Sequence, residues 1–105
     1  MFFAVDRELR SKGYGSQILN ELQKLYPDKT VIVSIEHSNT DETGELERRK
    51  RFYLRNGFTE TGYLIRMRGV EQEILVRNGQ FSKAKFRAFF TLYSNGTLWP
   101  KIWKK

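Results

Sequence analysis

Residue types that bind phosphate gather near the start of the chain. Residues 10–16 read Arg-Ser-Lys-Gly-Tyr-Gly-Ser and follow a short apolar run at residues 2–6. Glycine lets the backbone approach a ligand closely, and the unpaired N–H groups where a helix begins attract anions. Because a helical pattern starts after the second glycine, the segment predicts a site for a phosphate-bearing ligand. The alternative is a tight strand-to-helix turn with no ligand.

Two nucleotide-binding motifs match this segment less well. A dinucleotide fingerprint needs a third glycine where the chain has Ile18, although Glu36, at the end of the next expected strand, stands where a ribose-binding acid would. A Walker-type P-loop needs Gly-Lys followed by Ser or Thr, and residues 15–17 read Gly-Ser-Gln. A degenerate nucleotide-binding fold stays open as an interpretation.

Composition narrows the possible chemistry. The chain has no cysteine and a single histidine, His37, which excludes disulfides and thiolate chemistry and argues against a histidine metal site. The net charge of +7 favours an anionic partner, which is a phosphorylated small molecule, a nucleic acid or an acidic surface. With no apolar run of membrane-spanning length and no secretory pattern, we expect a cytoplasmic protein with no membrane partner.

Apolar periodicity predicts the elements that position the segment. The 105 residues suffice for one domain. We expect strands at residues 2–6, 30–36, 58–67 and 69–76, helices at about residues 14–25, 45–56 and 81–93, and loops at residues 7–15 and 37–44. Residues 98–105 show no clear period. The first strand, helix and strand make a βαβ unit with parallel strands, and the last two strands make an antiparallel hairpin. The expected fold is α/β, a mixed sheet of about four strands with about three helices.

Local signals mark two helix ends. Ser82 is the expected N-cap of the last helix, where Phe81 and Phe86 have the spacing of a hydrophobic staple. Gly57 is expected to take the left-handed conformation after the second helix, with Phe58 folding back onto its last turn.

Two motifs together resemble a known family. The pattern Val5-Asp6-x-x-Leu9-Arg10-x-Lys12-Gly13-x-Gly15-Ser16 resembles the acetyl-CoA-binding motif of the GNAT superfamily of N-acetyltransferases. Downstream, Phe52-Tyr53-x-x-Asn56-Gly57-Phe58 is similar to the second block of that family, a helix that carries Phe-Tyr and ends in Gly-Phe. The resemblance covers roughly residues 2–93 and implies a single, N-terminally truncated GNAT-type domain over residues 1–105.

The resemblance implies roles for individual residues. The CoA pyrophosphate would be held by Arg10, Ser11, Lys12, Gly13, Tyr14, Gly15 and Ser16. The backbone of Phe3, Ala4 and Val5 would bind the pantetheine arm, because family strands splay apart beside this one. Tyr53 would protonate the departing thiolate, since a thiol with a pKa of roughly 8.5 leaves more readily when a hydroxyl donates to it.

Other residues have open interpretations. Tyr53 could instead be a core aromatic, and Glu36 is the candidate that accepts the amine proton. His37 is expected to be an exposed loop residue rather than a base. Many family members carry an asparagine where this chain has Leu46. The basic run at residues 48–51 suggests a solvated helix face, a nucleic-acid patch, or one contact with the CoA 3′-phosphate.

The expected function is transfer of an acetyl group from acetyl-CoA to an unidentified amine by direct attack, with no metal required. The strand at residues 2–6 would be an open, apolar sheet edge because the family's preceding elements are absent, and we expect a homodimer to cover it. The alternatives are a non-catalytic CoA-binding or structural remnant and a basic nucleic-acid-binding module.

Overall fold

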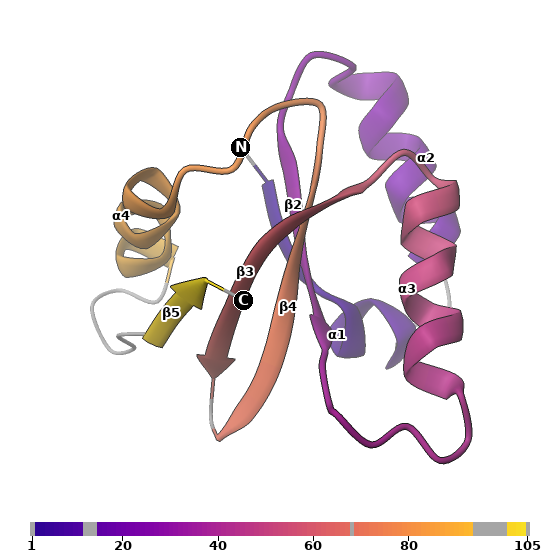
Figure 1. Cartoon of the computed structure of the whole chain (residues 1–105). Coiled ribbons are helices and arrows are strands. Elements are labelled where there is room, and N and C mark those ends of the chain that lie inside the picture. Colours follow the sequence, from indigo (N-terminus) through magenta and orange to yellow (C-terminus); the bar gives the residue numbers. More distant parts are fainter. Residues whose placement is uncertain (1, 12–14, 68, 94–100, 105) are drawn as a thin grey trace.

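The computed structural model describes residues 2–11, 15–67, 69–93 and 101–104, and shows one sheet with helices on both faces (Figure 1). The elements in chain order are β1 (Phe2–Val5), α1 (Asp6–Ser11), α2 (Gly15–Leu25), β2 (Val31–Glu36), α3 (Glu45–Arg55), β3 (Thr59–Met67), β4 (Val70–Arg77), α4 (Lys83–Tyr93) and β5 (Lys101–Lys104). None of the helices in the described residues is long and apolar enough to span a membrane.

The sheet is mixed and has the strand order β1-β2-β4-β3-β5. The parallel pair β1 and β2 places Phe2 opposite Val31 and Val5 opposite Ser34, whereas β4 pairs antiparallel with both β2 and β3. The α/β class, the parallel βαβ unit and the antiparallel hairpin are therefore confirmed. The β1 strand lies at one edge of the sheet, as expected.

The closing strand β5 is a difference from the expectation. It pairs antiparallel with β3, so that Ile102 lies opposite Ile65 and Trp103 opposite Leu64. Four residues are too few to show a clear hydrophobic period, and this strand forms because its apolar residue Ile102 is buried against β3.

The expected loop over residues 7–15 is partly wrong, because Asp6–Ser11 forms the short helix α1. Within this turn Leu9 is buried and joins the core that α2 and α3 cover. An extended loop would not bring Leu9 back over the sheet so soon after β1. The helical turn is therefore favoured by the apolar surface that it buries.

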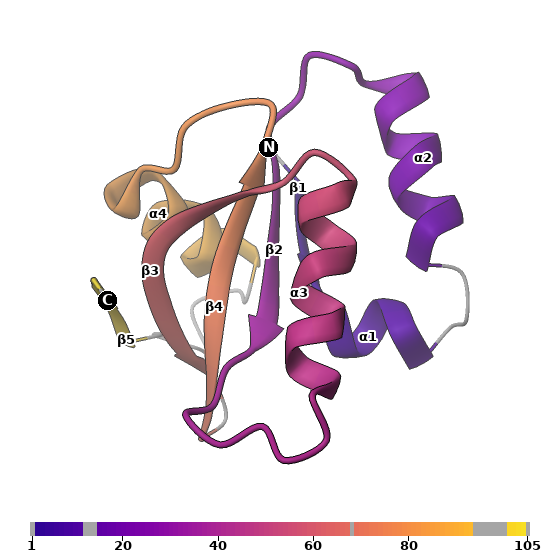
Figure 2. The ribbon, with the colours of Figure 1, turned by 45° about the vertical axis from the view of Figure 1, so that its right-hand side comes forward.

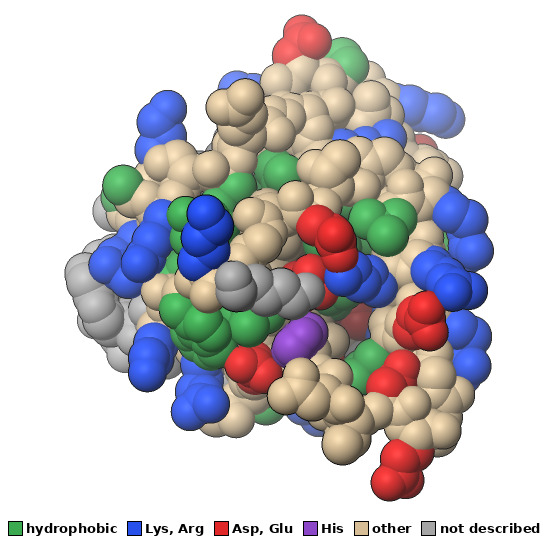
Figure 3. Space-filling view, in the orientation of Figure 1, with side chains coloured by type: hydrophobic (Ala, Val, Ile, Leu, Met, Phe, Trp, Pro, Cys, Tyr) green, Lys and Arg blue, Asp and Glu red, His purple; other side chains and the backbone are tan. Residues whose placement is uncertain are grey.

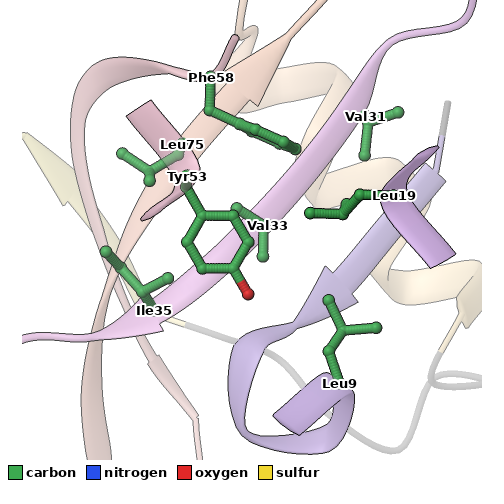
Figure 4. Packing of buried hydrophobic residues seen from close by; sticks show 8 residues of the cluster. All are labelled: Leu9, Leu19, Val31, Val33, Ile35, Tyr53, Phe58 and Leu75. Atoms are coloured by element: carbon green, nitrogen blue, oxygen red, sulfur yellow. The ribbon is translucent and has the colours of Figure 1, made fainter. Parts of the chain in front are cut away.

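Alternate side chains of the strands pack in two separate hydrophobic cores, one on each face of the sheet. On the face of α1, α2 and α3, the buried residues are Leu9, Leu19, Val31, Val33, Ile35, Tyr53, Phe58 and Leu75 (Figure 4). On the face of α4, they are Ile32, Ile65, Ile74, Val76, Phe86 and Ile102. Figure 2 shows α4 on one side of the strands and the other helices on the opposite side. Because successive side chains of a strand point to opposite faces, Ile32 and Val33 of β2 pack in different cores.

The predicted helix ends are confirmed. The Ser82 hydroxyl accepts from the Lys85 N–H at 3.3 Å, and the rings of Phe81 and Phe86 lie 5.5 Å apart. Gly57 has a φ of 89°, and the Phe58 N–H donates back to the Tyr53 carbonyl at 3.1 Å. This backbone reversal buries the Phe58 ring against α3, and the helix ends where the sequence indicates.

Candidate functional site

The predicted phosphate cradle divides into three parts. Arg10 and Ser11 belong to the last turn of α1, and residues 12–14 (Lys12, Gly13 and Tyr14) lie outside the described residues. Gly15 and Ser16 begin α2, an eleven-residue helix with no acidic residue in its first turn. A first turn without carboxylates leaves the positive end of the helix dipole uncompensated, which suits an anion.

The pairing of β1 with β2 ends at Val5. Their register runs without interruption through the pair Val5 and Ser34, so Phe3 and Ala4 lie in the paired part of the strand and not beside a splay. Beyond this pair, β2 continues through Ile35 and Glu36, whereas the chain leaves the sheet into α1 at Asp6. The pairing of β1 with β2 therefore ends at Val5, where the chain turns into α1.

Two buried polar side chains meet where the chain leaves β1. The Tyr53 hydroxyl, on α3, donates to Oδ1 of Asp6 at 2.5 Å, and the two residues are only 1% and 3% exposed. The Tyr53 ring packs edge-on against Phe52 and Phe58, with centroid distances of 5.1 and 5.5 Å. Figure 4 shows its hydroxyl pointing toward Leu9. Tyr53 is thus a core aromatic whose hydroxyl has a carboxylate partner beside the predicted donor site.

Asp6 is a site residue that the sequence analysis did not single out. Its only signal was its place in the motif, directly after Val5. A buried carboxylate is costly unless it accepts hydrogen bonds, and the Tyr53 hydroxyl supplies one. Because Asp6 is also the first residue of α1, this contact joins α3 to the turn after β1.

The two candidate bases occupy different environments. Glu36 ends β2 with an exposed side chain. His37 differs from the expectation of an exposed loop residue, because its backbone N–H donates to the Glu71 carbonyl at 3.0 Å and its Nδ1 lies 3.3 Å from Oε2 of Glu71. The His37 side chain is 21% exposed. Figure 3 shows this histidine at the surface, close to acidic side chains.

The basic side chains at residues 48–51 of α3 form hydrogen bonds and ion pairs with acceptors of the same chain. Arg49 pairs with Glu45, and Arg51 pairs with Glu47 at 2.8 Å, one helical turn away in each case. Arg48 Nη1 donates to the Thr43 carbonyl at 3.1 Å. These contacts match the expectation of a solvated helix face rather than a continuous cationic patch.

Lys50, the fourth residue of this run, forms a cluster with two acids of the sheet. Its Nζ contacts Glu60 and lies 3.1 Å from the carboxylate of Glu73, which is 2% exposed. Burial lowers the pKa of Lys50, but the hydrogen bonds and charges of Glu60 and Glu73 outweigh it, so that the pKa lies above its ordinary value. Lys50 neutralises a buried carboxylate and is not available to a polyanion.

Comparison with protein families finds a match in the part of the chain that contains these residues. The model of a family described as the acetyltransferase (GNAT) domain matches residues 1–60. This range contains β1, α1, α2, β2 and α3, and therefore includes Asp6, Tyr53 and the predicted phosphate cradle. No curated protein and no solved structure matches the chain significantly.

Proposed function

Because the chain belongs to the GNAT acetyltransferase domain family, we propose that it binds acetyl-CoA and transfers the acetyl group to an amine. The observation that carries this proposal is the family match over residues 1–60, more than half of the chain. The matched elements include the strand, the turn and the helix start that were predicted to hold phosphate. The uncharged first turn of α2 supports the same assignment.

The donor is proposed to lie between the end of β1 and the start of α2. The pyrophosphate is held by backbone N–H groups at Gly15 and Ser16, together with the predicted contacts of residues 10–14. Of the proposed pantetheine contacts at Phe3, Ala4 and Val5, that of Val5 lies at the last residue of β1 that pairs with β2. The backbone near Val5 is also proposed to hold the thioester carbonyl oxygen.

Tyr53 is the proposed general acid, and its hydrogen bond adds a step to this role. The hydroxyl donates to Asp6, so it must turn from the carboxylate to the sulfur in order to protonate the thiolate. Glu36 is the residue that the sequence proposes for the amine proton, and its exposed side chain at the end of β2 is accessible to an acceptor. The proposed transfer is direct attack of the amine on the thioester.

A non-catalytic CoA-binding domain is the second candidate function. The observation that favours it is the burial of Tyr53, which is 1% exposed and already donates to Asp6. In that case the donor site is kept while the tyrosine is a structural residue. The nucleic-acid-binding alternative is disfavoured by the internal contacts of the α3 basic run.

Self-association through β1 is also proposed, because an unpaired strand edge is normally covered. The apolar surface at this edge is smaller than expected, since the Phe3 ring packs against Phe86 of α4 with centroids 5.2 Å apart. Among the described residues, large exposed hydrophobic side chains lie instead on α3 and at the end of α2, at Leu54, Leu25 and Tyr26. Light scattering at micromolar concentration tests the dimer, and a stable monomer overturns it.

Calorimetry and a thiol-release assay separate the candidate functions. Saturable binding of acetyl-CoA and CoA, with thiol release that depends on an added amine, is the expected result. Suitable amines are a lysine-containing peptide, a peptide with a free N-terminus and a polyamine. Binding without release for any amine supports the non-catalytic alternative. If neither CoA nor acetyl-CoA binds at millimolar concentration, the donor site is wrong, and salt-dependent binding of a DNA duplex then favours the nucleic-acid alternative.

A further inference from the structure

We propose that His37, oriented by Glu71, is the group that takes the proton from the acceptor amine. This inference rests on the proposed acetyl transfer and names a second catalytic residue for it. It replaces the interpretation of His37 as an exposed loop residue. The side-chain and backbone contacts between His37 and Glu71, and the face of the sheet that His37 occupies, carry the inference.

The contacts with Glu71 fix both the position and the orientation of the imidazole. The His37 N–H donates to the Glu71 carbonyl at 3.0 Å, so the β2–β4 ladder continues one residue beyond Glu36. On the same face, Nδ1 lies 3.3 Å from Oε2 of Glu71. A carboxylate next to Nδ1 favours the tautomer with the proton on Nδ1, and this tautomer leaves the lone pair on Nε2. Nε2 is then the atom that can accept a proton.

His37 lies on the same face of the sheet as Tyr53. Side chains two positions apart on a strand share a face, and Val33, Ile35 and His37 follow this period along β2. Val33 and Ile35 pack in the core that contains Tyr53 (Figure 4). His37 extends this row beyond Ser34, the last residue of β2 that pairs with β1. The proposed acid and base therefore lie on the same face of the sheet.

Glu36 has neither of these properties. As the neighbour of His37 along the strand, it belongs to the opposite face, in register with Gln72 of β4. Imidazole is also the side chain whose protonation state changes near neutral pH, which suits a group that alternately accepts and releases a proton.

Charged residues of the neighbouring strands lie near the pair that His37 forms with Glu71. Glu73 is two positions from Glu71 on β4, and Arg66 of β3 is in register with Glu71. Lys50 of α3 pairs with Glu73. Glu71 is the group in hydrogen-bond geometry with the ring.

The protons balance across the transfer. Nε2 of His37 takes one proton from the ammonium form of the acceptor and passes it to solvent, which leaves a neutral amine to attack the thioester carbon. As the C–N bond forms and the C–S bond breaks, the Tyr53 hydroxyl gives its proton to the sulfur. The proton lost by the new amide nitrogen restores the Tyr53 hydroxyl. No oxidant, metal or additional co-reactant is needed.

The tautomer can be measured directly because the chain contains a single histidine. We expect ¹⁵N-resolved NMR of the wild-type imidazole to show, in its neutral form, the proton on Nδ1. In Glu71→Gln the proton is expected mainly on Nε2, as in a free histidine. A control, Glu42→Gln, changes an exposed acid in the following loop and should retain the wild-type tautomer. A wild-type ring with its proton on Nε2 overturns the assignment of Glu71.

Kinetics test the proton transfer itself. His37→Asn keeps a side-chain donor for Glu71 and is expected to lower kcat/KM for the amine about 100-fold, with unchanged affinity for acetyl-CoA. Added imidazole should restore part of this rate. Glu42→Gln should retain wild-type kinetics.

The possible outcomes distinguish this inference from the proposed function. Amine-dependent turnover that survives His37→Asn, or a loss of rate that imidazole does not rescue, overturns the role of His37 and leaves acetyl transfer standing. Acetyl-CoA binding with no turnover of any tested amine overturns the transfer, and with it the role of His37. A failure to bind acetyl-CoA overturns the donor site.

Discussion

The Tyr53 hydroxyl of α3 donates to the Asp6 carboxylate at 2.5 Å, across 47 positions of sequence. Both side chains are almost completely buried. Asp6 is the residue at which the chain leaves β1 and enters α1, so the bond fixes this turn against α3. The turn leads to the start of α2, and one buried contact therefore links the core to the proposed donor site.

Removing either partner of this bond should destabilise the fold. Tyr53→Phe takes away a donor from a buried carboxylate, and Asp6→Asn replaces the charged acceptor. Each change is expected to lower the free energy of unfolding by about 1–3 kcal/mol. In urea denaturation, a double-mutant cycle should show coupling of at least about 0.5 kcal/mol. Tyr26→Phe, at an exposed position, is the matched control and should cost less than either buried substitution. Additive effects of the two substitutions would contradict an energetic link.

Tyr53→Phe also tests the general-acid role. The variant keeps the aromatic ring in the core, so the affinity for acetyl-CoA should remain near that of the wild type. If the hydroxyl protonates the thiolate, kcat should fall about 100-fold. Thiol release under saturating acetyl-CoA measures this change, and calorimetry measures the affinity. An unchanged kcat would assign Tyr53 to the core alone while the donor site is retained.

A negative charge at the start of α2 should weaken donor binding without harming the fold. Gln17 is exposed in the first turn, and Gln17→Glu places a carboxylate where the phosphates are proposed to lie. The helix dipole favours this charge by about 0.3–1 kcal/mol, so the melting temperature should stay level or rise slightly. Acetyl-CoA affinity should fall about tenfold.

The control for this prediction is Asn20→Asp, which adds the same charge at an exposed position further along α2. It should leave the affinity for acetyl-CoA nearly unchanged, because Asn20 lies beyond the first turn, to which the dipole effect is confined. Equal losses in the two variants would indicate a general charge effect and would contradict a site at the start of the helix.

The Lys50 cluster should make stability depend on alkaline pH. The pKa of Lys50 is raised in the folded protein by Glu60 and Glu73, despite partial burial. Its contribution is therefore fully present below the ordinary lysine pKa of about 10.4. It is lost as the pH rises through the higher pKa of the folded state. Urea titrations between pH 7 and 11 should show this decline in the wild type.

Lys50→Met should remove the part of the alkaline decline that comes from Lys50. At neutral pH it should lower the free energy of unfolding by about 3 kcal/mol, because buried Glu73 loses this cation. Arg51→Met breaks an exposed pair with Glu47 and should cost less than about 1 kcal/mol. If the two substitutions lower the free energy of unfolding equally, the buried pair contributes no more to stability than the exposed pair.

Local sequence signals predicted the elements well. The apolar period of α2, the β-branched run of β2 and the cap residues Ser82 and Gly57 each act within a few positions of the chain. Such signals predict a helix, a strand or a helix end because the interactions are local. The βαβ order then required parallel pairing of β1 and β2, which the register confirms. Helix α1 and strand β5 were missed because short elements depend on what they pack against.

The sequence by itself determined the α/β class, the main elements and the two motifs that point to the family. Only the tertiary structure decided which polar groups meet: Tyr53 with Asp6, and His37 with Glu71 across 34 positions. Packing of α3 over the sheet brings Tyr53 to Asp6. Strand register brings His37 to Glu71, because a slip of one residue would turn them to the other face of the sheet. Register results from packing of the whole core, so no local pattern could reveal these pairs.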